Sequence, residues 1–246
     1  MSTSLARRAA AEALGSAALV AVVVGSGIQA SELSSDAGVR LLANSLATVL
    51  GLGVLIIVFG PVSGAHFNPV VSLAVWFSER RSDGGFSLRD VAVYAPAQIA
   101  GAIGGAVLAN AMFAEPLVSW STQDRSGGHL WLAEAVATAG LLLVILGLAR
   151  ANRAHHAPLA VASFIGAAYW FTSSTSFANP AVTIGRAFTD TFAGIAPGSV
   201  LPFICAQFAG AVIALGVVAT VFARPAQAAY DPAVRAISRP VERSAP

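Results

Sequence analysis

Charged residues are scarce in this chain of 246 residues, and lysine is absent. Only 11% of the residues are charged, whereas roughly a quarter are charged in a typical soluble domain. The 14 basic residues are all arginine and are scattered along the chain, which excludes a nucleic-acid-binding face. The single cysteine, Cys205, excludes an internal disulfide and a cysteine-based metal cluster. The sequence has no nucleotide-binding loop, catalytic acid–base pair or metal-ligand motif, so it indicates no enzyme, cofactor or bound metal.

Hydrophobic residues, by contrast, make up 56% of the chain and form blocks that are too long for a globular core. A bilayer core about 30 Å thick takes about 20 apolar helical residues. The blocks that meet this length predict six transmembrane helices: 9–30, 41–60, 89–113, 130–149, 158–176 and 200–223. The first block follows Arg7 and Arg8 as a secretory signal would, but no small-residue cleavage site ends it. We therefore expect an all-α, multi-pass membrane protein.

Two shorter segments, 61–79 and 177–195, each follow a predicted span and contain Asn-Pro. Neither is long enough to cross the bilayer, so both predict re-entrant half-helices. Asn is a preferred N-cap, and Pro suits the first helical position because its missing N–H would have no partner there. The boxes Asn68-Pro69-Val70 and Asn179-Pro180-Ala181 therefore each predict the start of a short helix.

The two halves of the chain, about 9–113 and 130–223, repeat one another. Three motifs recur in the same order: Ala11-Glu12-Ala13 with Ala133-Glu134-Ala135, the two Asn-Pro boxes, and Ala97-Gln98-Ile99-Ala100-Gly101-Ala102 with Ala206-Gln207-Phe208-Ala209-Gly210-Ala211. Each half holds three spans, so the second half inserts upside down and forms an inverted repeat. The small residues Gly101 and Gly210 predict close approach between helices.

Physical chemistry gives the boxes a function. Each helix N-terminus carries about +0.5 of an elementary charge, so two N-termini that meet at the membrane midplane repel cations, including hydronium. Each Asn can cap its helix with its oxygen and turn its NH2 group toward a pore. Two such donors would hold a passing hydroxyl oxygen and interrupt a proton wire. The boxes therefore predict a passive pore for neutral solutes.

Arginine placement predicts the orientation of the chain. If the N-terminus is cytoplasmic, eleven arginines lie on the cytoplasmic side and only Arg40 and Arg125 lie outside. This distribution predicts a plasma or inner membrane protein with both termini, 1–8 and 224–246, in the cytoplasm. The tail 224–246 is rich in Pro, Ala and Arg, and we expect it to be disordered.

The spans, the inverted repeat and the segments 63–70 and 177–181 resemble the major intrinsic protein family, the aquaporins and aquaglyceroporins. The resemblance covers residues 9 to about 223 and is greatest to the bacterial aquaglyceroporins associated with arsenic resistance. It implies an aquaporin-like channel domain over 9–223 that forms a homotetramer in the lipid bilayer with one pore per subunit. It also implies passage of small neutral solutes: water, polyols such as glycerol, and metalloid hydroxides such as arsenite.

In this family four residues form a constriction, the selectivity filter. Family spacing from Asn68 and Asn179 places it at Thr48, Ala167, Ser176 and Val182, and a slip of one residue would substitute Phe177 or Ala168. Val182 stands where the family usually has an arginine. We therefore expect a wide, uncharged filter that passes solutes larger than water and leaks more protons than a filter with the arginine.

Several polar residues near the boxes have two interpretations. Arg186 either lines the outer vestibule, or it only braces loop carbonyls or pairs with Asp190. His66 either lines the cytoplasmic half of the pore or hydrogen-bonds the loop. Glu12 and Glu134 are the only acids deep within the spans, and intramembrane acids are often functional. We interpret them as structural carboxylates that satisfy the backbone of the re-entrant loops.

Three other functions remain open on sequence alone. A water-selective aquaporin would pass no glycerol, and a closed structural tetramer would pass nothing. An ion-coupled secondary transporter also uses inverted repeats and broken helices, but it needs a coupling-ion site. Only Glu12 and Glu134 could provide that site, and saturable, proton-dependent uptake would distinguish such a transporter from a passive channel.

Overall fold

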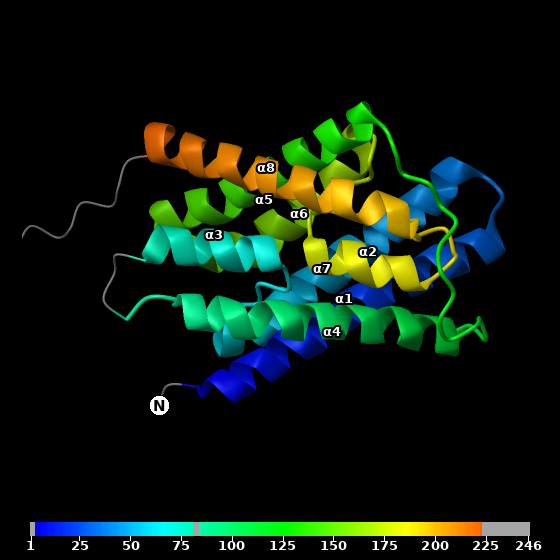
Figure 1. Cartoon of the computed structure of the whole chain (residues 1–246), viewed down its shortest axis with the longest axis horizontal. Coiled ribbons are helices and arrows are strands. Elements are labelled where there is room, and N and C mark those ends of the chain that lie inside the picture. The colour runs from blue at the N-terminus through cyan, green and yellow to red at the C-terminus, as the bar shows by residue number, and fades with distance from the viewer. Residues whose placement is uncertain (1–2, 81–83, 223–246) are drawn as a thin grey trace, which may run out of the picture.

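The computed structural model describes residues 3–80 and 84–222, and it is helical in architecture over those residues (Figure 1). Five of its helices are long and apolar enough to span a membrane: α1 (Leu5–Leu33), α2 (Ala37–Ser63), α4 (Leu88–Met112), α5 (Gly128–Arg150) and α8 (Pro197–Val221). α6 (Ala157–Phe171) has 15 residues and follows the 3-10 turn η1 (Ala154–His156). The expected tail, 224–246, lies outside the described residues.

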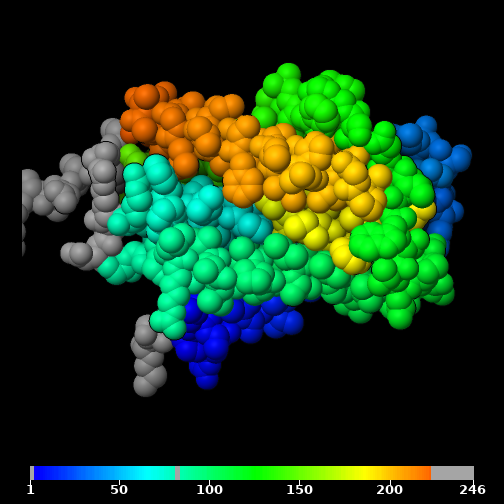
Figure 2. Space-filling view, viewed as in Figure 1, coloured from blue at the N-terminus to red at the C-terminus, as the bar shows by residue number. Residues whose placement is uncertain are grey.

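Both Asn-Pro segments contain a short helix, as predicted. α3 (Pro69–Glu79) follows the first Asn, and α7 (Pro180–Gly185) follows the second and continues into the 3-10 turn η2 (Arg186–Phe188). The two short helices lie end to end through the middle of the bundle (Figure 1). Figure 2 shows their surfaces between those of α4 and α8 on one face of the molecule.

The helix boundaries differ by a few residues from the sequence-based expectation, and two of the differences lie next to the Asn-Pro segments. α2 does not end at residue 60 but continues through Pro61 to Ser63, and Gly64 ends it with a left-handed φ of 89°. A proline this close to the C-terminus removes only one hydrogen bond of the last turns. α6 ends at Phe171 rather than at 176, because Thr172 takes an extended backbone conformation with φ −110° and ψ 138°. The Thr172 hydroxyl donates to the carbonyl of Ala168 in the last turn.

Glycines set the spacing within each repeat, which confirms the predicted close approach. A Cβ added to Gly101 of α4 would lie 2.1 Å from the carbonyl oxygen of Ala13 in α1. In the second repeat, a Cβ on Gly210 of α8 would lie 2.3 Å from the carbonyl oxygen of Ala135 in α5. Backbone therefore contacts backbone at equivalent places in both halves, and only glycine permits it.

Candidate functional site

The two boxes start their helices as the sequence predicts. The Oδ1 atom of Asn68 accepts a hydrogen bond from the backbone N–H of Val70 at 3.0 Å. The Oδ1 atom of Asn179 accepts from the N–H groups of Ala181 and Val182, at 2.9 and 3.3 Å. Both Asn residues have extended backbone angles and are followed by Pro at the first helical position, the geometry of an N-cap.

The boxes also hydrogen-bond to each other, which the sequence did not indicate. Asn68 Nδ2 donates to the carbonyl of Ala178 at 2.8 Å, and Asn179 Nδ2 donates to the carbonyl of Phe67 at 2.7 Å. These reciprocal bonds fix α3 and α7 with their N-termini facing each other. Both Asn residues line the central cavity, and each amide has a second N–H with no partner among the described residues.

The carboxylate of Glu12 organises the loop before the first box and is fully buried. It accepts hydrogen bonds from the Ser63 hydroxyl (2.6 Å), the backbone N–H groups of His66 (3.0 Å) and Phe67 (2.6 Å), and Gln98 Nε2 (2.7 Å). Phe67 has a φ of 49°, so these bonds hold a strained backbone in place. The contacts fit the structural interpretation of this acid.

Glu134 makes the same set of contacts in the second repeat and is also fully buried. Its carboxylate accepts from the Ser174 hydroxyl (2.7 Å), the N–H groups of Phe177 (2.8 Å) and Ala178 (2.9 Å), and Gln207 Nε2 (2.7 Å). Ser174 follows Ser63 at the same offset of 111 residues that separates the two Asn residues. The serines were missed in the sequence, although this offset could have identified them.

A cavity of about 610 Å³ passes the boxes and runs along the bundle. It extends from Arg186, near the beginning of α5, to Ala154 and His155, beyond the end of α5. We call the first of these the Arg186 end. We call the second the Arg8 end, because α1, which carries Arg8, begins on that side of the bundle. Between them its wall is mainly apolar and includes Leu52 of α2. No Asp or Glu of the described residues lines the cavity.

Three of the four residues predicted for the constriction line this cavity: Thr48, Ser176 and Val182. The fourth assignment was wrong, since Ala167 is exposed and lies outside the lining. Residues 161, 165 and 169 line the cavity at four-residue spacing, and this face of α6 excludes 167. Tyr169 of α6 lines the cavity instead, so the wall carries an aromatic side chain on this face.

Arg186 has features of both interpretations. It lines the cavity, and its Nε donates to the carbonyl of Ala193 in the following loop. Its guanidinium carbon lies 3.5 Å from the ring centroid of Phe177, which also lines the cavity. The proposed pairing with Asp190 is absent from the described structure, because that carboxylate accepts from the N–H and hydroxyl of Thr122 at 2.8 and 2.9 Å.

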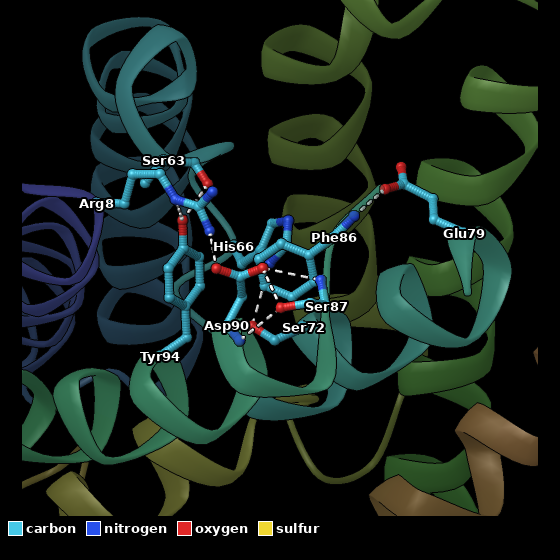
Figure 3. A network of polar contacts seen from close by, with 9 residues as sticks. All are labelled: Arg8, Ser63, His66, Ser72, Glu79, Phe86, Ser87, Asp90 and Tyr94. Carbon is cyan, nitrogen blue, oxygen red and sulfur yellow. Dashed lines mark hydrogen bonds and ion pairs between the residues drawn. The ribbon is translucent and has the colours of Figure 1, made fainter. Parts of the chain in front are cut away.

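His66 also has features of both interpretations. It lines the cavity, and its Nδ1 lies 3.1 Å from the hydroxyl oxygen of Ser72 in α3. Its ring packs edge-on against Phe86, with centroids 4.9 Å apart, and against Tyr94 at 5.6 Å (Figure 3). Two aromatic rings therefore pack against the imidazole and restrict its orientation.

Arg8, near the beginning of α1, bonds to Tyr94 and to the neighbouring Asp90. Arg8 Nη2 forms an ion pair with Asp90 at 2.5 Å, and Arg8 Nε donates to the Tyr94 hydroxyl at 3.1 Å (Figure 3). That hydroxyl in turn donates to the carbonyl of Ser63 at 2.8 Å. These contacts connect α1 and α4 to the end of α2 just before the first box.

No group of three or more His, Cys, Asp or Glu side chains in the described part of the chain could hold a metal ion. The polar groups around the cavity are instead single donors and acceptors on an apolar wall. Such an arrangement can bind and orient a small uncharged molecule by a few hydrogen bonds while offering it no charged partner at the boxes.

Comparison with known proteins agrees with this geometry. Residues 1–176 match the family described as "Major intrinsic protein". The aquaglyceroporin AqpS of Rhizobium meliloti (strain 1021) is 50% identical over 211 residues, which are 86% of this chain and 88% of that protein. The glycerol uptake facilitator protein of Pseudomonas aeruginosa is 30% identical over 263 residues, with 91% of each chain covered. The X-ray structure of the aquaglyceroporin from Plasmodium falciparum has a TM-score of 0.67 and 25% identity, covering 89% of this chain and 97% of that one.

Proposed function

Because this chain belongs to the major intrinsic protein family, we propose that its cavity is the path of a passive channel for water and small neutral solutes such as glycerol. The family and the relatives described above are channels rather than enzymes. The observation that carries the proposal is the pair of reciprocal bonds between the boxes. They place two helix N-termini and two amide donors on the cavity wall, where cations are repelled and hydroxyl oxygens are bound.

The selectivity filter of this channel consists of Thr48, Tyr169, Ser176 and Val182. Three of these residues carry a hydroxyl and offer polar contacts: Thr48, Tyr169 and Ser176. Val182 offers an apolar contact. A solute with several hydroxyls on a small core matches such a wall. Glycerol and arsenite both present three hydroxyls at similar size, so we expect this filter to pass both of them.

The channel is a multi-pass membrane protein, and we place it in the plasma or inner membrane as a homotetramer with one pore in each subunit. The Arg8 end faces the cytoplasm, as the excess of arginines there predicts. Large apolar side chains on α2 support contact with lipid or with a neighbouring subunit. They are exposed at nearly regular helical spacing: Leu46, Leu50, Val54 and Ile57.

Stopped-flow light scattering on proteoliposomes tests the function. Vesicles containing the purified chain are mixed with an impermeant sugar, with glycerol or with arsenite, and protein-free vesicles serve as the control. We expect fast shrinkage in sugar, and fast re-swelling after shrinkage in glycerol and arsenite. Fast shrinkage without re-swelling would indicate a water-selective channel. No acceleration for any solute would indicate a closed protein, and saturable uptake that collapses with the proton gradient would indicate a transporter.

A further inference from the structure

Arg186 carries a buried positive charge that forms no ion pair within the described part of the chain. Its side chain is only 3% exposed, yet it forms no ion pair in the described part of the chain, where Arg8–Asp90 is the ion pair found. Its one side-chain hydrogen bond uses Nε, which donates to the carbonyl of Ala193. The N–H groups of Nη1 and Nη2 bond to no described residue, although Arg186 lines the cavity. Buried charges in proteins are normally paired, so these N–H groups remain available to an acceptor in the cavity.

A second cation lies beside the first. The guanidinium carbon of Arg125 is 5.0 Å from the ring centroid of Phe177, the same ring on which Arg186 stacks at 3.5 Å. Arg125 donates only to backbone carbonyls, from Nε to Gly194 at 2.8 Å and from Nη2 to Phe192 at 3.4 Å. Two guanidinium groups share one ring, and their mutual repulsion would be relieved by an anion between or beside them.

Three acids of the segments around Arg186 have other partners. The carboxylate of Glu134 accepts from Phe177 and Ala178 N–H groups and from two side chains, and Asp190 accepts from Thr122. Asp124 is exposed, and hydrogen bonds from its neighbours' hydroxyls, Ser126 first, hold its pKa below its ordinary value. The positive potential at this end of the cavity is therefore not cancelled by an ion pair among the described residues.

We propose that Arg186, held on the face of Phe177, binds a small monovalent carboxylate at the Arg186 end of the cavity, where the anion competes with neutral solutes. A guanidinium group presents parallel N–H donors that match the two oxygens of a carboxylate. The structure thus supplies both the charge and the donors for one carboxylate group.

The remainder of the wall defines the ligand further. Val182 lies one helical turn before Arg186 and also lines the cavity, so a short carbon chain attached to the carboxylate would contact an apolar surface. An inorganic divalent anion would have no such contact, and Arg125 does not line the cavity, so its second charge would face an apolar wall. Acetate and propionate therefore fit better than sulfate. Binding of the carboxylate does not depend on the proposed channel function. Its competition with neutral solutes does rest on that function.

Equilibrium dialysis of the purified full chain in detergent tests the binding. The ligand is radiolabelled acetate, and chloride is added to keep the ionic strength constant. We expect saturable binding that propionate displaces and sulfate does not. Arg186→Gln should raise the dissociation constant about tenfold or more, as loss of a charge-assisted hydrogen-bonded pair does. Arg186→Lys should retain weaker binding, because the charge remains but the planar fork is lost.

Arg40→Gln is the matched control. Arg40 lies at the same end of the bundle, at the beginning of α2, and also donates to backbone carbonyls, those of Ser34 and Ser31, but it does not line the cavity. Its replacement should leave acetate binding unchanged. The proposal is overturned if the wild-type chain shows no saturable binding or if Arg186→Gln binds acetate as well as wild type. It is also overturned if sulfate displaces acetate as well as propionate does.

Glycerol re-swelling of proteoliposomes with equal acetate on both sides tests the competition. The wild-type rate should fall toward a limit as acetate rises, and the Arg186→Gln rate should not respond. If acetate binds in dialysis but wild-type vesicles carry no glycerol, the proposed function fails and the binding site stands. If glycerol flux is fast but acetate neither binds nor inhibits, the site fails and the channel stands.

Discussion

The hydroxyl oxygens of Thr48 and Tyr169 lie 3.1 Å apart on the cavity wall and join α2 to α6. The Thr48 hydroxyl donates to the carbonyl of Asn44 at 2.8 Å, so Tyr169 is the donor in the bond between the two hydroxyls. The phenol is therefore fixed in direction, and its ring lines the cavity from the α6 side. This geometry makes Tyr169 the residue by which filter width can be changed.

Replacing Tyr169 with Ala should widen the filter. We expect erythritol, a polyol one carbon longer than glycerol, to re-swell Tyr169→Ala vesicles severalfold faster than wild-type vesicles. Tyr169→Phe keeps the ring and loses only the hydroxyl, so its erythritol rate should stay near the wild-type rate. Stopped-flow light scattering at matched protein density gives both rates.

Ala167→Leu is the control for this assignment, because Ala167 is exposed and outside the cavity lining. The larger side chain should leave glycerol and erythritol rates unchanged. If Ala167→Leu blocked glycerol flux while Tyr169→Ala left the erythritol rate unchanged, Ala167 rather than Tyr169 would belong to the filter. That result would contradict the position of Ala167 in the structure.

Replacing Val182 with Arg should narrow the filter and add a charge to it. Val182 lines the cavity and is 6% exposed, so a longer side chain can only extend into the open space. We expect glycerol and arsenite re-swelling to slow about tenfold or more while osmotic water flow persists, because water is the smaller molecule. Unchanged glycerol and arsenite rates in this variant, with water flow intact, would show that Val182 is not part of the filter.

Local and repeated signals allowed much of this site to be predicted from the sequence. An N-cap followed by Pro has one local conformation, so Asn68 and Asn179 could be placed without knowing the fold. The repeat then made Glu12 and Glu134 equivalent, and the structure gives them equivalent contacts. Ser63 and Ser174 obey the same offset and could have been added.

The remaining features depend on tertiary geometry. Tyr169 was missed because spacing from Asn179 assumes a loop length, and α6 ends at Phe171. The bonds between the boxes were missed because they join residues 110 and 112 positions apart that only the inverted fold brings together. Arg186 could be assigned to neither role alone, because its Nε donates to the loop carbonyl of Ala193 while the residue also lines the cavity.

Replacing Glu12 or Glu134 with Gln should destabilise the protein. Each carboxylate accepts two backbone N–H groups and two side-chain donors, and an amide must turn its own NH2 toward some of them. An unsatisfied buried donor costs about 1–3 kcal/mol, and more where a charge is involved. Thermal unfolding in detergent should show a clear loss for both variants, and Glu32→Gln, at an exposed acid, should show none. Wild-type stability of both buried variants, with flux lost, would instead indicate a functional carboxylate.

Two neighbouring glycines of α4 offer a matched test of the close helix contact. Gly101→Ala places a Cβ 2.1 Å from the Ala13 carbonyl oxygen and should destabilise the protein by about 1–3 kcal/mol, as overpacking does. Gly104 has no atom within 4 Å of the added Cβ, so Gly104→Ala should be neutral or slightly stabilising through its helix propensity. Thermal unfolding in detergent compares the two. Equal effects would mean that α1 can move away from α4 without loss.

Proton leak follows from the same filter. In the proposed filter Val182 replaces the usual arginine, so we expect the barrier to protons to consist mainly of the two half-helix N-termini and the amides of Asn68 and Asn179. Wild-type vesicles loaded with a pH-sensitive dye should therefore leak protons faster than protein-free vesicles after an acid jump. Val182→Arg should slow this leak, because a fixed guanidinium at the filter repels hydronium. Arg186→Gln should increase the leak, since it removes the cation that already lines the cavity one helical turn away. A wild-type leak no greater than that of protein-free vesicles would mean that the Asn boxes alone exclude protons and that the filter cation is dispensable for this purpose.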